Sequence, residues 1–121
     1  MSTLLTRNKD GVMVIYLPDV RLIDASRIES LGAELVNLVN KTEQQRFVLN
    51  FQNVTHMSSA MIGKLIAFAL KCQGAKVALR LCGINDNISK IFKVMKLEGQ
   101  FQIEADEDTA IASFDKKGWF G

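Results

Sequence analysis

Short apolar runs alternate along this chain with longer segments whose apolar residues recur every three or four positions. Four runs have the length and composition of strands: residues 12–17, 46–51, 76–82 and 101–103. Four other segments have the spacing of one apolar helix face: residues 24–41, 59–72, 85–95 and 106 onward. Such alternation is typical of an α/β layer in which most neighbouring strands are parallel.

The boundaries between these segments carry recognisable turn and cap residues. The sequence Asn-Lys-Asp-Gly at 8–11 is a turn signal, so we expect residues 4–6 to pair with the first run in a hairpin. Asp24 is expected to cap the first helix, and Gly74 is expected to end the second in the C′ position. The predicted element order is β(β)αβαβαβα.

Length and composition favour one globular domain. The chain has 121 residues, of which 48% are hydrophobic and 23% charged. These values predict a single domain over residues 1–121, with a core at about 4–115 and a loose tail at 116–121. The net charge of +2 and the scattered basic residues do not favour a nucleic-acid partner.

Location is predicted from what the sequence lacks. The first ten residues contain no long apolar stretch of the kind found in secretory signals, and no apolar stretch approaches the roughly 20 residues of a membrane helix. The two cysteines, Cys72 and Cys82, are too few for a disulfide scaffold and are expected to be buried as small hydrophobic residues. We expect a cytoplasmic protein with no membrane partner.

Motifs for catalysis or cofactor binding are not found in the sequence. His56 is the only histidine, which excludes a two-histidine metal site, and we expect it to be a partly buried loop residue. The glycines form neither a dinucleotide-binding motif nor a phosphate-binding loop. No G-x-S-x-G elbow surrounds the serines. We therefore predict that the protein is not an enzyme and uses no cofactor and no metal.

A pair of serines stands where a strand pattern gives way to a helical one, in the sequence VTHMSSAMIGK at 54–64. A serine at this place can cap the helix, because its hydroxyl accepts a hydrogen bond from an unpaired backbone N–H. The same helix end tolerates an anion, so a phosphate on Ser59 would change the surface without melting the helix. Met57 and Met61 flank the pair, either as core filler or as an adaptable apolar surface. Both interpretations of the serines, cap and switch, remain open at this point.

Two longer stretches carry a resemblance to a known family. VLNFQNVTHMSSAMIGKLI and the following GAKVALRLCGINDNISKIFKVMKLEGQFQI resemble the STAS family, which is named for sulfate transporters and anti-sigma factor antagonists. The similarity extends from about Val12 to Phe114 and is greatest to the small stand-alone bacterial antagonists. It implies a STAS-type fold: a mixed, mostly parallel central sheet of four to five strands with about four helices.

The resemblance also implies a site. Against the family's Asp-Ser-Ser/Thr-Gly motif, Ser58 takes the Asp position, Ser59 the phosphoacceptor position, Ala60 the second Ser/Thr position and Met61 the Gly position. Ser59 is therefore the candidate phosphoacceptor, and Ser58 is the second candidate. Loops at the carboxyl ends of strands share one edge of an α/β sheet. The expected partner-binding residues are Ser58, Ser59, Ala60, Met61, Asp24 and Gly83.

The function implied by the resemblance is that of an anti-sigma factor antagonist in transcription regulation. Its partner is an anti-sigma factor that is also a serine kinase. The unmodified antagonist binds this kinase and frees the sigma factor, phosphorylation of the serine ends the interaction, and a serine phosphatase resets it. The alternative is a STAS scaffold or transporter-associated module that is not phosphorylated and in which the serines only cap. The oligomeric state is left open.

Overall fold

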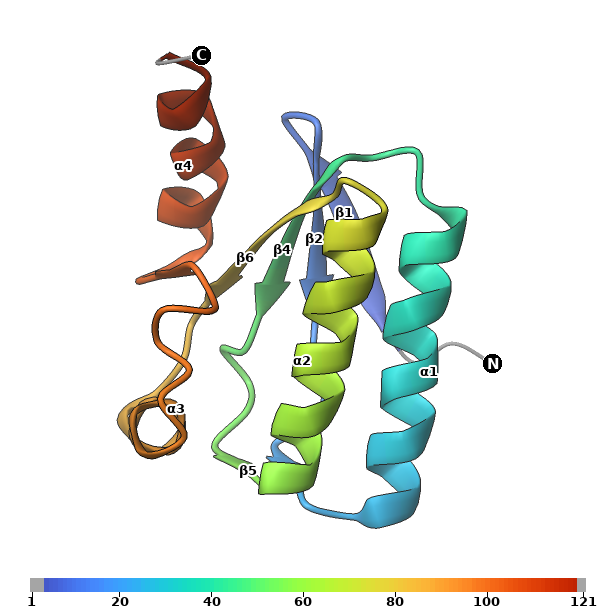
Figure 1. The fold of residues 1–121 in the computed structure, drawn as a ribbon, viewed down its shortest axis with the longest axis vertical. Helices are drawn as coiled ribbons and strands as arrows, with labels where there is room; N and C mark the ends of the chain where they lie inside the picture. The colour runs from blue at the N-terminus through green and yellow to red at the C-terminus, as the bar shows by residue number, and fades with distance from the viewer. Residues whose placement is uncertain (1–3, 120–121) are drawn as a thin grey trace.

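The computed structural model describes residues 4–119, with side chains described as far as residue 115 (Figure 1). Its main sheet has the strand order β1-β2-β4-β6-β7. The strands are β1 (Leu5–Lys9), β2 (Val12–Tyr16), β4 (Arg46–Asn50), β6 (Ala78–Cys82) and β7 (Ile103–Glu104). Among the strand pairs of this sheet in residues 4–119, only β1–β2 is antiparallel. The described residues form four helices: α1 (Ala25–Lys41), α2 (Ser59–Gly74), α3 (Asp86–Val94) and α4 (Glu107–Trp119). The predicted fold class, a mixed and mostly parallel sheet with four helices, is confirmed.

The β1–β2 hairpin follows from its turn residues. Lys9 pairs with Val12, which leaves Asp10 and Gly11 as a two-residue loop. Both have positive φ, 54° and 79°. A two-residue turn of this kind needs left-handed backbone at both positions, and Asp-Gly is among the sequences that supply it most readily. The hairpin was expected, although β1 reaches Lys9 and is longer than the three residues we expected.

Helices cover both faces of the sheet, and this explains why the central strands show little alternation of polarity. In β4, Phe47 and Leu49 belong to the larger core cluster, on the face covered by α1 and α2. Val48, between them, belongs to a second cluster that includes Ala110 and Phe114 of α4. Figure 1 shows α1 and α2 side by side, with α4 away from them. A strand covered on both faces is apolar at successive positions.

A close approach of α1 to α2 depends on Gly32. A Cβ added to Gly32 would lie 2.8 Å from the Cδ of Lys64, so a larger residue would force the Lys64 side chain to move. Lys64 in turn donates a hydrogen bond from its Nζ to Oε1 of Glu29, at 2.8 Å. The stem of this lysine therefore covers the glycine while its charge remains paired.

The end of α2 differs from our prediction. Gly74 lies inside the helix, and Lys76 takes the left-handed conformation with φ of 60°. The N–H of Lys76 donates to the carbonyl of Gln73, and the N–H of Val77 donates to that of Cys72, at 2.8 Å. These two bonds form a Schellman motif with Lys76 in the C′ position. The helix therefore ends two residues later than it would with Gly74 in that position. The predicted role of Gly74 was wrong, because these two hydrogen bonds stabilise a left-handed lysine.

The last helix covers the second face of the sheet. Asp106 precedes α4, and its Oδ1 accepts a hydrogen bond from the N–H of Thr109 at 2.9 Å. The guanidinium of Arg80, whose side chain is only 4% exposed, lies 4.4 Å from the centre of the Phe114 ring. The helix runs to Trp119, past residue 116 where we expected a loose tail to begin. No helix in residues 4–119 combines the length and the apolar composition that crossing a membrane requires.

Candidate functional site

The carboxyl ends of β2, β4 and β6 lie at one end of the sheet, the lower end in Figure 1. A second, two-stranded parallel sheet forms there from β3 (Arg21–Leu22) and β5 (His56–Met57). We expected neither strand, because two residues are too few to show a period. This small sheet places the segment before α1 directly beside the segment before α2.

Hydrogen bonds join three loops at this edge. The N–H of Ser58 donates to the carbonyl of Leu22 at 3.0 Å, and that of Thr55 donates to Val20 at 2.7 Å. From the third loop, Nδ2 of Asn85 donates to the carbonyl of Thr55 at 3.1 Å. The segments that precede α1, α2 and α3 therefore form one connected surface.

Ser58 occupies the N-cap position of α2 but does not cap the helix with its side chain. Its carbonyl accepts the N–H of Met61 at 3.1 Å, whereas its hydroxyl forms no cap hydrogen bond. Its Oγ is buried and has no hydrogen-bond partner among the described residues. Asp24 and Asn85 do cap their helices, accepting from Arg27 and Ile88 at 2.8 and 2.9 Å. The expectation of a serine side-chain cap was wrong for α2, because the Ser58 oxygen is buried away from the first-turn donors.

Ser59 is the first residue of α2, and its side chain is exposed, as is that of Ala60. The first N–H groups of a helix have no acceptor within the helix, and the helix dipole gives this end partial positive charge. No acidic residue lies in the first turn of α2. The end of the helix therefore favours an anion, and the Ser59 side chain beside it is accessible from solvent.

The two methionines beside the serines belong to the core. Met61 is fully buried, and Met57 is 5% exposed; both lie in the main hydrophobic cluster. Met61 was expected in the partner surface, but its side chain offers no atom to a partner in this structure. Two exposed apolar residues lie at the same edge instead: Val20 is 56% exposed and Ile23 is 53% exposed. They flank the two residues of β3, and no sequence pattern points to them, because a strand two residues long shows no period.

Gly83 is at this edge for a structural reason. Its φ is +72°, and an added Cβ would lie 3.0 Å from the backbone nitrogen of Gln52 and 3.1 Å from Oδ1 of Asn50. Asn50 is buried, and its Oδ1 accepts a hydrogen bond from that same nitrogen at 2.7 Å. Gly83 therefore allows the loop after β6 to lie against the loop after β4.

The histidine and the cysteines have different environments. His56 is exposed and lies in β5, so the expectation of a partly buried loop residue was wrong; its Nδ1 is 2.9 Å from the Thr55 hydroxyl. Cys72 and Cys82 are buried as expected, and burial raises the pKa of each thiol to about 12. Within the described part of the chain, no group of three or more histidine, cysteine or acidic residues could hold a metal ion.

Comparison with known proteins adds family and fold to this geometry. The STAS domain family matches residues 3–110. Because the match covers most of its length, the chain belongs to the STAS domain family.

Several solved structures have the same fold. The anti-sigma factor antagonist SpoIIAA in its unphosphorylated form is 17% identical with a TM-score of 0.75, and the match covers 94% of this chain and 97% of that one. The phosphorylated form of Bacillus SpoIIAA is 18% identical with a TM-score of 0.68, covering 93% and 99%. An anti-sigma factor antagonist from Mycobacterium paratuberculosis is 19% identical with a TM-score of 0.79, covering 92% of each chain. At these identities the likeness concerns the fold.

Proposed function

We propose that this STAS domain protein is an anti-sigma factor antagonist that binds an anti-sigma factor, itself a serine kinase, and so frees a sigma factor. Phosphorylation of Ser59 by the kinase ends the binding, and a serine phosphatase restores it. The protein acts by binding rather than by catalysis, in the cytoplasm. Two proteins of the same fold are described as anti-sigma factor antagonists, and one of them has been solved with and without phosphorylation, which supports the proposal.

The observation that carries the proposal is the exposed hydroxyl of Ser59 at the first position of α2. A phosphate there adds nearly two negative charges, which the positive end of the helix stabilises. The fold therefore tolerates the modification without rearrangement. Ser58 is a poorer acceptor, because its oxygen is buried and a kinase could reach it only after the side chain turned outward.

The partner surface that we propose combines Ser59 and Ala60 with Asp24 and the two exposed apolar side chains of Val20 and Ile23. Apolar side chains that a partner covers completely tend to contribute most of the binding energy at an interface. A phosphate placed beside such a contact must be desolvated when the partner binds, which is unfavourable. Phosphorylation thus weakens binding by changing the partner surface directly, without rearranging the fold.

The proposal is tested by calorimetric titration of the chain against candidate anti-sigma factor kinases. Ser59→Ala should bind as tightly as the unchanged chain, and Ser59→Asp should bind at least about tenfold more weakly. Ala67→Asp is the matched control, because it adds the same charge to an exposed position on the same helix, about 12 Å farther along its axis. Its affinity should be unchanged.

Equal affinity of Ser59→Asp and Ser59→Ala for a kinase that binds the unchanged chain would contradict a switch at this position. A chain from native cells that carries no phosphate under any growth condition would instead favour the STAS scaffold in which Ser59 only begins the helix. Val20→Asp tests the apolar part of the surface. Loss of kinase binding with unchanged stability would show that the partner contacts Val20.

A further inference from the structure

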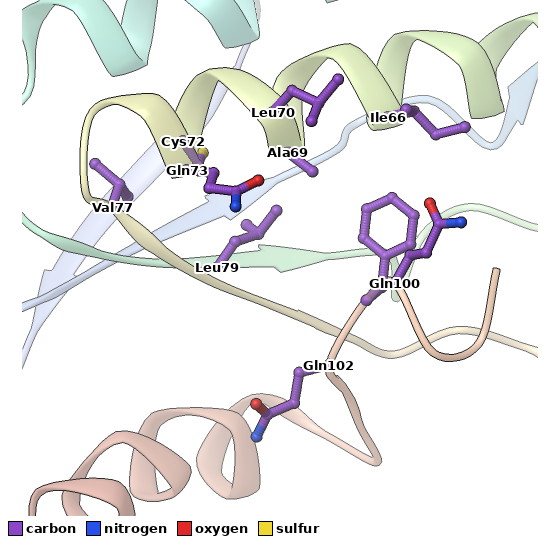
Figure 2. A pocket seen from close by; sticks show the side chains of 10 residues that line it. Ile66, Ala69, Leu70, Cys72, Gln73, Val77, Leu79, Gln100 and Gln102 are labelled. Atoms are coloured by element: carbon purple, nitrogen blue, oxygen red, sulfur yellow. The ribbon is translucent and has the colours of Figure 1, made fainter.

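A cavity of about 380 Å³ opens between α2, β6 and the loop that leads to β7 (Figure 2). It is lined by Ile66, Ala69, Leu70, Cys72, Gln73, Val77, Leu79, Gln100, Phe101 and Gln102. The first lining residue on α2 is seven positions after Ser59, or about 10 Å along the helix axis. The cavity is therefore separate from the partner surface proposed above.

The walls of this cavity are apolar and held in place by the core. Val77 and Phe101 are buried, and Leu79 is half-buried on β6. The Phe101 ring contacts that of Phe92 in the core, with ring centres 5.6 Å apart. The apolar lining is thus formed by the fold itself and does not require a ligand to assemble it.

Side-chain amides supply the polarity at its opening. Figure 2 shows the Gln73 side chain extending from α2 toward Leu79, with Gln100 on the other side of the cavity. Neither amide forms a side-chain hydrogen bond to another described residue, whereas Nε2 of Gln102 donates to Glu104 at 3.2 Å. Two amides, each both a donor and an acceptor, are therefore available from opposite sides.

Charge is the property that the lining lacks: none of its ten residues is acidic or basic. A carboxylate, phosphate or ammonium placed inside would lose water without gaining an opposite charge. The volume lies at the lower end of the range of about 300–1,000 Å³ that small-molecule sites occupy. Size, apolar walls and amides together fit one class of ligand.

We propose that this cavity is a binding site for a small uncharged molecule with a mostly apolar body and at least one hydrogen-bonding group. The body lies against Val77, Leu79 and Phe101, and the polar group is held by the amide of Gln73 or Gln100. The site is independent of the proposed switch, so either can fail without the other.

A matched pair of fluorescent probes tests the class of ligand. Phenylnaphthylamine is uncharged and carries one N–H, and anilinonaphthalene sulfonate has the same aromatic body with an added anion. Both brighten on entering an apolar site. We expect saturable binding of phenylnaphthylamine with one site per chain, at least about tenfold tighter than that of the sulfonate.

Two substitutions locate the binding. Ala69→Phe should fill the cavity and weaken binding of phenylnaphthylamine at least about tenfold, whereas Ala67→Phe adds the same bulk at an exposed position outside the lining and should leave it unchanged. Leu70→Lys is the second variant, and because Leu70 is 62% exposed the fold should tolerate it. A lysine at this rim should reverse the preference toward the sulfonate.

No saturable binding of phenylnaphthylamine, or binding that Ala69→Phe and Ala67→Phe weaken equally, would overturn the proposal. Equal affinities for the two probes in the unchanged chain would overturn the assignment to uncharged ligands. Circular dichroism of each variant confirms that it is folded before its titration is interpreted.

Discussion

Replacing Ser58 with alanine should leave the stability of the protein nearly unchanged. An N-cap serine normally contributes about 1 kcal/mol through the hydrogen bond of its hydroxyl. The Ser58 hydroxyl makes no such bond, and its buried oxygen has no partner among the described residues. Removing an unpaired buried polar group relieves a desolvation penalty, which offsets the lower cap preference of alanine. We expect the free energy of unfolding to change by less than about 0.5 kcal/mol.

Asp24→Ala is the matched control. Asp24 is an exposed N-cap whose Oδ2 accepts the N–H of Arg27 at 2.8 Å, so its removal should lower the free energy of unfolding by about 1 kcal/mol. Urea unfolding followed by circular dichroism resolves the two variants, because with a slope of about 2 kcal/mol per molar this loss shifts the midpoint by roughly 0.5 M.

A loss of about 1 kcal/mol in Ser58→Ala, equal to that in Asp24→Ala, would refute this reasoning. It would mean that the Ser58 hydroxyl caps α2 in solution. Ser58 would then be a structural cap, and Ser59 alone would belong to the partner surface.

Two further predictions concern backbone and thiols. Gly83→Ala should lower the free energy of unfolding by about 1–3 kcal/mol, because φ is +72° and the new Cβ meets the neighbouring loop. Gly63→Ala should raise the free energy of unfolding by up to about 1 kcal/mol, because Gly63 lies inside α2 and its new Cβ would meet nothing within 4 Å. Urea midpoints measure both variants, and an equal loss of stability in the two would contradict the geometry. Cys72 and Cys82, with pKa values raised to about 12 by burial, should resist alkylation in the native state and react fully in urea. Because the thiols ionise near pH 9.0 when unfolded but near 12 when folded, the free energy of unfolding should fall as the pH rises from 9.0 toward 12. Rapid labelling of the native protein would contradict the burial, because it would show that the thiols are accessible.

The sequence was informative wherever a local pattern decides the structure. The alternation of strand and helix periods predicted the order of the helices and of the main-sheet strands but missed β3 and β5, and Asp24 was correctly predicted to cap α1. The sequence Asp-Gly predicted the hairpin turn, because few other residues accept left-handed backbone twice in succession. The edge of the sheet at which the loops meet follows from the parallel order of the strands.

Features set by tertiary contacts could not be predicted in the same way. Lys76 rather than Gly74 takes the left-handed position, because the hydrogen bonds that follow α2 stabilise it there. Whether Met61 faces the core or a partner depends on the direction in which α2 leaves β5, which a helical pattern does not define. The burial of the Ser58 oxygen likewise depends on the packing around it, which a sequence pattern does not define. These details change the candidate surface from a serine and methionine patch to one of Ser59 with exposed apolar neighbours.

Site-resolved mass spectrometry of the chain isolated from its native cells is the most direct test of a switch at Ser59. The tryptic peptide Phe47–Lys64 contains both serines and no other site of cleavage. We predict a fraction of this peptide with one phosphate on Ser59, varying with growth conditions, and none on Ser58. A peptide that carries no phosphate under any condition, or that carries it on Ser58, would contradict the proposed switch.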